Sequence, residues 1–524
     1  MKKIVKFLSM LLLLQACNGE QFASVDIVDY DDGNVGHEMI VLGERLEDPY
    51  SVENMSQALS AVYGTKADRV VLTATDYYVR FLPESEEEYD MLEAMGLVML
   101  DHPVDYEIVK EGDWYHDPAI PDEEITWQYA VVDKDFQFPA GIRYEKLEDC
   151  YISDNDKGTK ADWVDWMAVE AEAFRLTGNG GLLAPATKAG GNVPHGRITI
   201  SDDRTREVSG VKGVTVCCNS FVKIATAFTD EEGNYQMSKS FASEVRYRLE
   251  FKNKFGFGIG FNLVLVPASL SALGKHSSDG YDYHIDRTSE RKLFCRSVVN
   301  NAGYDYFKDC EEKGMECPPK DLRIWLFQGM KRSSAPMLQQ GAFVDGSILA
   351  NYLGTYLSLL KMFLPDITLG MEDQDDFASI YGTAIHEFAH ASHFMQVGKT
   401  FWNSYIRNVL LSFITSGFTT YGAGTEEGHG YCEIAEMWAY YVQTMFFREK
   451  YQDETAVFGT SFWFRPQILV TLDERGLTRQ KIFNAYTPDI CDKDALQTKL
   501  VSLYPEMKNT ISSVLNSSQS FILK

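Results

Sequence analysis

The spacing of apolar and polar positions divides the chain into stretches of different expected structure. The run VVLTATDYYVRFLP (70–83) is rich in β-branched and aromatic residues, and the acidic run ESEEEYDMLEAMG (84–96) follows it. The first composition is typical of a strand, and the second has the periodicity of a helix. We therefore predict a small α+β domain over residues 17–160, with its many acidic side chains forming a solvated face.

A helix and a linker are expected next, over residues 161–193. ADWVDWMAVEAEAFRL (161–176) has helical spacing, and the Gly- and Pro-containing stretch TGNGGLLAPATKAGGN (177–192) is typical of a linker. The glycines at 178–181 lack the GKS/T ending of a phosphate-binding loop, so a nucleotide site is not expected there.

Residues 194–270 change to short alternating runs separated by turn residues. Regularly spaced short strands predict a β-sandwich. The runs are HGRITISD, GVTVCCN, VKIATAFT, NYQMSKS and YRLEFKN, with the turn TDEEGNY among them. This stretch resembles the carboxypeptidase regulatory-like domain of exported bacterial proteins, and the resemblance implies a spacer or docking module rather than a catalytic one.

The remainder, residues 271–524, has mostly helical patterns. Two strand candidates, DLRIWLF (321–327) and PDITLGM (365–371), flank the helical pattern ILANYLGTYLSLLKMF (348–363). The fold class predicted for the whole chain is therefore multidomain α+β. It comprises a small α+β N-terminal domain, a β-sandwich middle domain and a mainly helical C-terminal domain.

One stretch of the helical part, YGTAIHEFAHASH (381–393), contains three of the ten histidines. On a helix, His386 and His390 leave the same face one turn apart, so both can reach a single ion at ~2.0–2.1 Å. Glu387 is rotated by ~100° from His386 and cannot be a third ligand, but it can reach a water beside the ion. This HEXXH arrangement predicts a metal site with Glu387 as general base.

The third ligand has to come from elsewhere in the chain. A metzincin would require Gly at position 393 and His at position 396, but this sequence has His393 and Gln396. A later helical segment, GHGYCEIAEMWAYY (428–441), carries Glu433 and Glu436 on one face. Spacing alone does not decide which of the two would bind the ion.

HEFAH followed by an Ala-Glu-containing helix resembles the gluzincin-type zinc metallopeptidases. The resemblance implies a Zn²⁺ ion held by His386, His390 and Glu436, with Glu433 as the alternate ligand. The glutamate that does not bind the ion would orient a metal-bound imidazole through a hydrogen bond. A zincin-like C-terminal domain follows from the same resemblance.

Other residues near the motif receive smaller roles. His429 and Tyr431, in the turn before the glutamate helix, are candidate donors to the oxyanion that forms when water attacks a carbonyl. His393 lies ~10 Å along the helix from the first histidine of the motif and is expected to pack rather than bind. In gluzincins the strand before the HEXXH helix binds extended substrate by edge pairing, so 321–327 or 365–371 would take that role here.

The N-terminus has the pattern of an export signal. Three lysines precede the apolar run 7–14, which is shorter than the ~20 residues that a membrane-spanning helix needs. Residues 14–17 (LQAC) resemble a bacterial lipobox, which implies a signal peptide over 1–16 and a membrane anchor on lipidated Cys17. Asn18 lacks the carboxylate that retains such lipoproteins in the inner membrane, so we expect the outer membrane or cell surface.

Composition excludes one class of partner. The formal net charge of −27 argues against nucleic acid, because phosphate binding needs clustered Lys and Arg. Of nine cysteines, an even number remains beside Cys17, which permits disulfides in an exported protein without indicating their pairing.

Together, the lipobox, the regulatory-like stretch and the HEXXH motif resemble metallopeptidase lipoproteins of the Bacteroidota. We therefore predict a surface-anchored zinc-dependent enzyme that hydrolyses peptide bonds of a peptide or protein through a metal-activated water. The alternative is a non-catalytic surface lipoprotein that binds host protein or glycan and has a structural or vestigial metal site. A structural site is closed by four protein ligands, whereas a catalytic one keeps a position for water. The sequence indicates neither the peptide specificity nor the oligomeric state.

Overall fold

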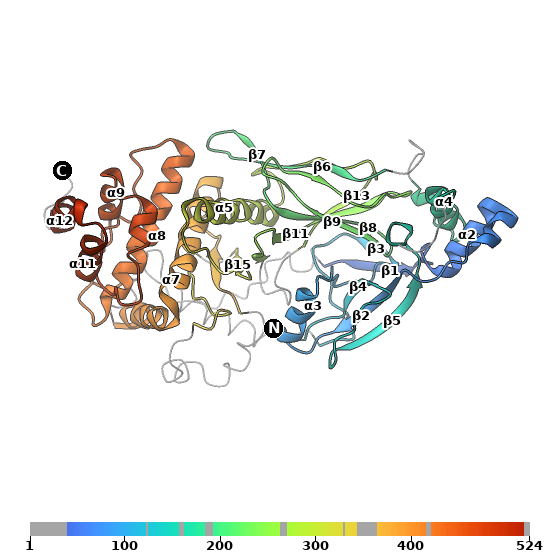
Figure 1. Ribbon diagram of the computed structural model, residues 1–524, viewed down its shortest axis with the longest axis horizontal. Coiled ribbons are helices and arrows are strands. Elements are labelled where there is room, and N and C mark those ends of the chain that lie inside the picture. Colours follow the sequence, from blue (N-terminus) through green and yellow to red (C-terminus); the bar gives the residue numbers. More distant parts are fainter. Residues whose placement is uncertain are drawn as a thin grey trace.

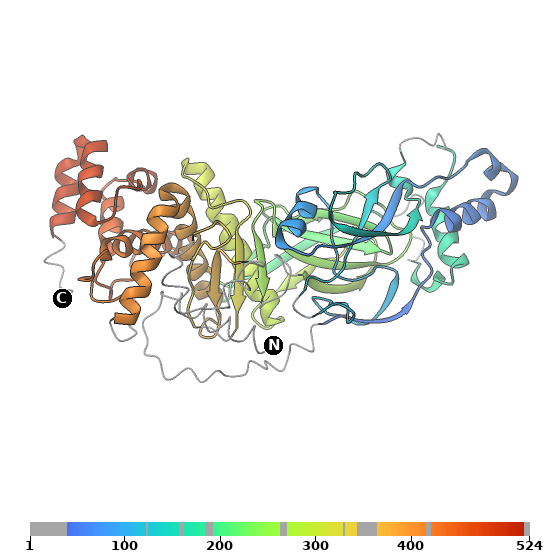
Figure 2. The ribbon, with the colours of Figure 1, turned by 90° about the horizontal axis from the view of Figure 1, so that it is seen from below.

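The computed structural model describes residues 39–121, 124–156, 162–183, 192–261, 270–328, 331–342, 364–415 and 421–517. The molecule is elongated. Helices α8, α11 and α12 lie at one end, α2 and α4 lie at the other, and the β-sheets lie between them (Figures 1 and 2). The mixed α+β class and the helical C-terminal region predicted from the sequence are confirmed.

Within the described residues, the N-terminal region contains two small sheets and three α-helices. Strands β1 and β3 pair antiparallel, and β4, β2 and β5 form a second antiparallel sheet in that order. The predicted strand at 70–83 contains β2, and the predicted helix at 84–96 contains α3. The elements are β1 (Val41–Arg45), α2 (Val52–Tyr63), β2 (Asp76–Leu82), α3 (Glu86–Ala94), β3 (Tyr106–Lys110), β4 (Gln128–Asp133), β5 (Arg143–Cys150) and α4 (Trp166–Leu176).

In the middle region, the part of the chain that the structure describes from His195 to Ile285 contains nine strands. All five runs predicted from the sequence contain strands, namely β6, β8, β9, β10 and β11. The strands are β6 (His195–Ser201), β7 (Val208–Gly210), β8 (Val214–Ser220), β9 (Lys223–Phe228), β10 (Asn234–Gln236), β11 (Val245–Asn253), β12 (Gly258–Phe261), β13 (Leu270–His276) and β14 (Tyr283–Ile285). A four-stranded sheet contains β10, β6 and β14 in that order, with β7 also paired to β6.

The C-terminal region begins with a long helix and two buried strands. The two strand candidates contain β15 and β16, whereas the helical pattern at 348–363 lies outside the described residues. The elements are α5 (Arg291–Lys313), β15 (Arg323–Phe327), β16 (Ile367–Gly370), α7 (Phe377–Thr415), α8 (His429–Tyr451), α9 (Gln467–Glu474), α10 (Arg479–Phe483), α11 (Lys493–Leu503) and α12 (Lys508–Ser517). Both strands are buried at every residue, as expected for parallel strands covered on two faces.

The largest sheet crosses the boundary expected at residue 270. Its order is β16-β15-β12-β11-β8-β9, with β13 also paired to β11. Strands β12, β15 and β16 pair in parallel, and β12 joins them to the antiparallel strands of the middle region. One apolar core accordingly extends from Ile198 in β6 to Leu515 in α12. The middle strands therefore share one sheet with β15 and β16 and one core with the C-terminal helices.

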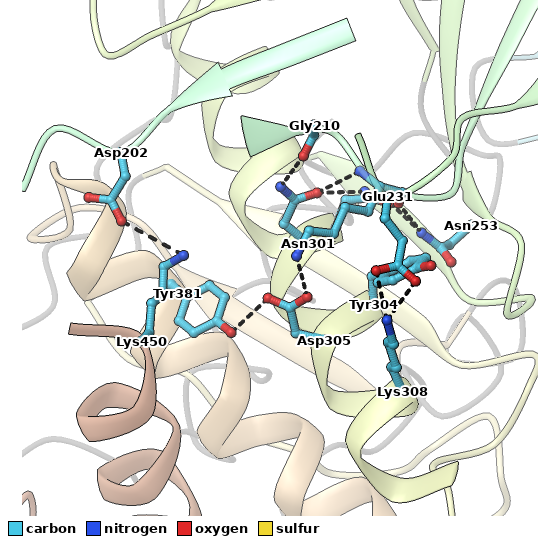
Figure 3. A network of polar contacts seen from close by, with 12 residues as sticks. Asp202, Gly210, Glu231, Asn253, Asn301, Tyr304, Asp305, Lys308, Tyr381 and Lys450 are labelled. Carbon is cyan, nitrogen blue, oxygen red and sulfur yellow. Dashed lines mark hydrogen bonds and ion pairs between the residues drawn. The ribbon is translucent and has the colours of Figure 1, made fainter. Parts of the chain in front are cut away.

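A polar network joins the middle strands to α5 and α7 (Figure 3). On α5, the amide of Asn301 donates to the carbonyl of Gly210 at 2.8 Å and accepts from the backbone N–H of Lys212 at 2.8 Å. Asp305, one turn further on, accepts from Lys212 Nζ at 2.6 Å and from the Tyr381 hydroxyl at 2.9 Å. The first turns of α7, which precede the HEXXH segment, are thus held to the middle strands through α5.

Candidate metal site

The HEXXH segment lies in the first half of α7. The backbone N–H of Ser379 donates to the Asp376 carboxylate at 2.9 Å, so this side chain caps the helix start. Gly398 interrupts the helix with φ 79° and ψ 174°, a conformation that residues with a Cβ rarely adopt. The interruption redirects the chain, and the second half of α7 returns Tyr405 to the ring of His390, with ring centroids 5.8 Å apart.

Two imidazoles and one carboxylate converge between α7 and α8. The Nε2 atoms of His386 and His390 lie 3.1 Å apart. Nε2 of His386 is 3.5 Å from one carboxylate oxygen of Glu436, and Nε2 of His390 is 3.5 Å from the other. One ligand atom from each residue lies within 4.8 Å of those from the other two, and all three side chains are buried. The structure thus brings together the ligand set preferred from the sequence.

The carboxylate of Glu436 also accepts two phenolic hydrogen bonds. The hydroxyl of Tyr405 donates to Oε1 at 2.6 Å, and that of Tyr421 donates to Oε2 at 3.0 Å. Burial by itself would raise the pKa of Glu436, but interactions with His390 and His386 outweigh this effect and hold it below its ordinary value. The carboxylate is therefore ionised in a place where water does not screen its charge.

Glu387 has a different environment from Glu436, although both are fully buried. Among the described residues, neither of its carboxylate oxygens has a hydrogen-bond partner. Burial raises its pKa well above the ordinary value, and the negative charge of Glu436 adds to the increase. An unpartnered buried carboxyl group is costly, and such groups are found where a ligand or a reaction uses them.

These residues fit a divalent metal ion. Two neutral imidazole nitrogens and a carboxylate oxygen form a donor set that zinc accepts, and three protein ligands leave one coordination position open. A cation between the two imidazoles and the carboxylate would stabilise the buried negative charge of Glu436. The oxygens of Glu387, which have no hydrogen-bond partner among the described residues, can accept a hydrogen bond from a polar ligand.

The alternate ligand, Glu433, points elsewhere. Its Oε2 accepts a hydrogen bond from the backbone N–H of Lys493 at 3.2 Å, so it faces the first residue of α11. The i,i+3 spacing places Glu433 and Glu436 on one broad face of α8. Their neighbours differ, because Glu433 faces α11 whereas Glu436 faces the two histidines of α7. Glu433 therefore lies outside the three-residue group.

The two candidate oxyanion donors have contacts outside this group. Nδ1 of His429 lies 2.8 Å from the carbonyl oxygen of Glu426, and its ring lies 5.5 Å from that of Trp463. The Tyr431 ring packs edge-on against Phe401 at 5.0 Å. Their proposed part in catalysis stays a prediction.

His393 is fully buried and packs against aromatic rings, as the sequence indicated. Its ring centroid lies 5.1 Å from that of Phe401, 5.7 Å from that of Trp402 and 5.0 Å from that of Tyr486. The Trp402 ring also contacts that of His390, with centroids 5.8 Å apart, so His393 belongs to the same aromatic cluster.

Sequence reasoning missed Tyr405 and Tyr421. Neither tyrosine belongs to a sequence motif with the histidines. Their positions beside Glu436 depend on the break at Gly398 and on how the chain returns toward α8. The aromatic character of the segment was visible, but aromatic residues are far more often part of a core than of a polar site.

The substrate-binding edge expected from the family resemblance is occupied in this chain. Strand β15 is internal, between β12 and β16. On the outer side of β16, Thr368 and Ser334 exchange backbone hydrogen bonds of 2.8 and 2.9 Å, and the N–H of Met337 donates to the carbonyl of Asp366 at 3.0 Å. The expectation that 321–327 or 365–371 offers a free edge is therefore wrong at these positions. The preceding segment around Ser334–Met337 already pairs with the backbone groups to which a substrate would bind.

Comparison with models of known protein families, with curated proteins and with solved structures finds no match to this chain.

Every helix within the described ranges is too short or too polar to cross a bilayer. The predicted signal peptide and Cys17 lie outside the described residues. The class of the protein is therefore inferred from the site itself.

Proposed function

We propose that the protein is a zinc-dependent hydrolase that cleaves peptide bonds. The observation that carries this proposal is the convergence of His386, His390 and Glu436 on one buried point, with the unpartnered carboxyl group of Glu387 beside the first histidine. His386, His390 and Glu436 would hold the ion. Bound there, zinc would supply positive charge that acidifies water and polarises a carbonyl group.

The chain's own groups then account for the proton transfers. An oxygen of Glu387 accepts the proton of the attacking water and later returns it to the leaving amine, as a general base and then a general acid. Both oxygens of Glu387 are available for this exchange, because neither is held by a hydrogen bond from the described residues. Positive charge beside Glu436 would also favour the ionised form of Glu387, which is the form that can accept a proton.

The predicted lipid anchor and surface location extend the proposal to a peptidase acting outside the inner membrane on a peptide or protein substrate. This extension is supported by the lipobox-like residues 14–17 and by the resemblance of the middle region to exported modules. The acidic chain is not expected to bind nucleic acid.

The second candidate function is a non-catalytic surface protein with a structural metal site. Two observations favour it: the ligand side chains are almost entirely inaccessible, and the outer edge of β16 is already paired. A fourth protein ligand would be required to close such a site.

The deciding experiment compares the native chain with Glu387→Gln, which keeps the shape of the side chain but cannot take up a proton. We expect both proteins to hold zinc on metal analysis and only the native one to cleave a library of fluorogenic peptides. Glu433→Gln is the matched control on the neighbouring helix and should retain zinc and cleavage. Equal turnover by native and Glu387→Gln proteins would overturn the mechanism. Zinc without any turnover by the native chain would favour the structural site, and no zinc in any protein would overturn both functions.

A further inference from the structure

Each carboxylate oxygen of Glu436 lies close to one imidazole and accepts a hydrogen bond from one phenol. Oε1 lies 3.5 Å from Nε2 of His390 and accepts from Tyr405, while Oε2 lies 3.5 Å from Nε2 of His386 and accepts from Tyr421. The two hydroxyls therefore approach the carboxylate from two different chain segments. Rotation of the carboxylate about its last torsion would break both hydrogen bonds together.

Both phenol rings are themselves fixed by packing. The Tyr405 ring lies between those of His390 and Trp402, with centroids 5.8 and 4.9 Å away. The Tyr421 ring packs edge-on against Phe462 at 4.9 Å and Phe464 at 5.1 Å.

The backbone of Tyr421 is held as well, because its carbonyl oxygen accepts from the indole N–H of Trp463 at 3.0 Å. Both tyrosines are almost completely buried. Their hydroxyls thus stand at set positions before any ligand arrives, which is the arrangement that orients a metal ligand most effectively.

We propose that Tyr405 and Tyr421 are positioning residues that hold the carboxylate of Glu436 with one oxygen toward each imidazole, and that they thereby set the affinity of the site for its metal ion. The inference rests on the proposed metal site, but it does not depend on catalysis. Hydrogen-bond partners of metal ligands typically contribute 10–100-fold to metal affinity. Without either hydroxyl, one oxygen of a buried carboxylate loses a hydrogen-bond donor, and the carboxylate is held less firmly toward the imidazoles.

The test measures the affinity of the full chain for Zn²⁺ by competition with a chelator, for the native protein, Tyr405→Phe and Tyr421→Phe. Tyr441→Phe is the matched control, since this buried tyrosine lies on the same helix as Glu436, α8, and donates to a carboxylate outside the metal site, that of Asp473. We expect Zn²⁺ binding to weaken about 10–100-fold in each of the first two variants and to stay native in the control. Near-UV circular dichroism of the metal-free proteins reports whether each variant is folded.

Native affinity or tighter binding in both folded variants would overturn the inference, as would equal weakening in the control. Because the two tyrosines come from separate segments, a folding failure of one variant leaves the other as the test. If the native chain cleaves peptides and binds Zn²⁺ but neither variant changes the affinity, only this inference fails. If the native chain binds no Zn²⁺, the proposed function fails with it.

Discussion

The Nε2 atoms of His386 and His390 lie 3.1 Å apart, with both rings facing the carboxylate of Glu436. Two histidines buried for packing alone would ordinarily turn their polar nitrogens toward separate hydrogen-bond partners. Here the Nε2 atoms of both histidines face each other and the same carboxylate instead. Their mutual approach is explained if both lone pairs are directed at a common ion.

The first prediction concerns the metal ligands. His386→Ala removes one of three donor atoms, so we expect Zn²⁺ binding to fall below detection in metal analysis of the purified protein. His393→Leu, which changes a buried histidine about two turns further along the same helix, should retain the ion. Zinc content that is equal in the two variants, whether high or low, would contradict the assignment of the ligands.

The second prediction concerns pH and Asp48, a buried residue far from the metal site in sequence. Burial raises its pKa from 3.8 to about 7, although the backbone N–H of Tyr50 donates to its Oδ1. Among the described residues its Oδ2 has no hydrogen-bond partner. The folded protein therefore binds a proton that the unfolded chain has released between those two pH values, and folding stability falls as pH rises through this window.

Asp48→Asn removes this dependence, because its amide stays neutral. Each unit of pKa shift corresponds to about 1.4 kcal/mol. We expect the metal-free variant to match the native protein near pH 4 and to be more stable by up to about 4 kcal/mol near pH 8, measured by thermal unfolding at both pH values. A variant that is less stable near pH 8 would show that the carboxylate is ionised and well solvated.

The third prediction concerns a buried ion pair between the N-terminal and middle regions. Nζ of Lys223 lies 2.6 Å from Oε1 of Glu170 and 2.6 Å from Oδ2 of Asp154, and the Lys223 and Glu170 side chains are both inaccessible. Lys223→Met leaves the carboxylate of Glu170 without its cation, a change that typically costs about 3–5 kcal/mol. Urea unfolding should show this loss.

Lys134→Met is the control for that substitution, because Lys134 pairs with Asp135 on the surface, where the two side chains are 49% and 78% exposed. Its unfolding midpoint should match that of the native chain, since exposed pairs contribute little. The prediction fails if the two methionine variants unfold at the same urea concentration.

The fourth prediction concerns the boundary near residue 270. A fragment of residues 271–517 lacks β12, so β15 would lose one of its two parallel partners and expose a row of unpaired backbone groups. We expect it to aggregate or to lack near-UV circular dichroism, whereas residues 192–517, which contain the whole seven-stranded sheet, should fold. Native-like zinc binding by the shorter fragment would show that the helical region is independent.

Local patterns predicted a large part of this fold. The strands β8 and β11 and the helices α3 and α4 were recognised because their periodicity and flanking turn residues lie within a few positions of one another. The short strands β7, β12 and β14 were not recognised, because each is only three or four residues long. In addition, β12 and β14 pair with strands that are distant in the sequence, β15 and β6, and no local window contains such pairing.

The sequence by itself determined the pair His386 and His390, because four residues of helix place two side chains on one face whatever surrounds them. It also determined that Glu387 must lie beside that pair. Only the tertiary structure decided between Glu433 and Glu436, which lie on one helix face but have different neighbours. It alone brought Tyr405 and Tyr421 to the chosen carboxylate, because their positions depend on the break at Gly398 and on how α7 and α8 pack.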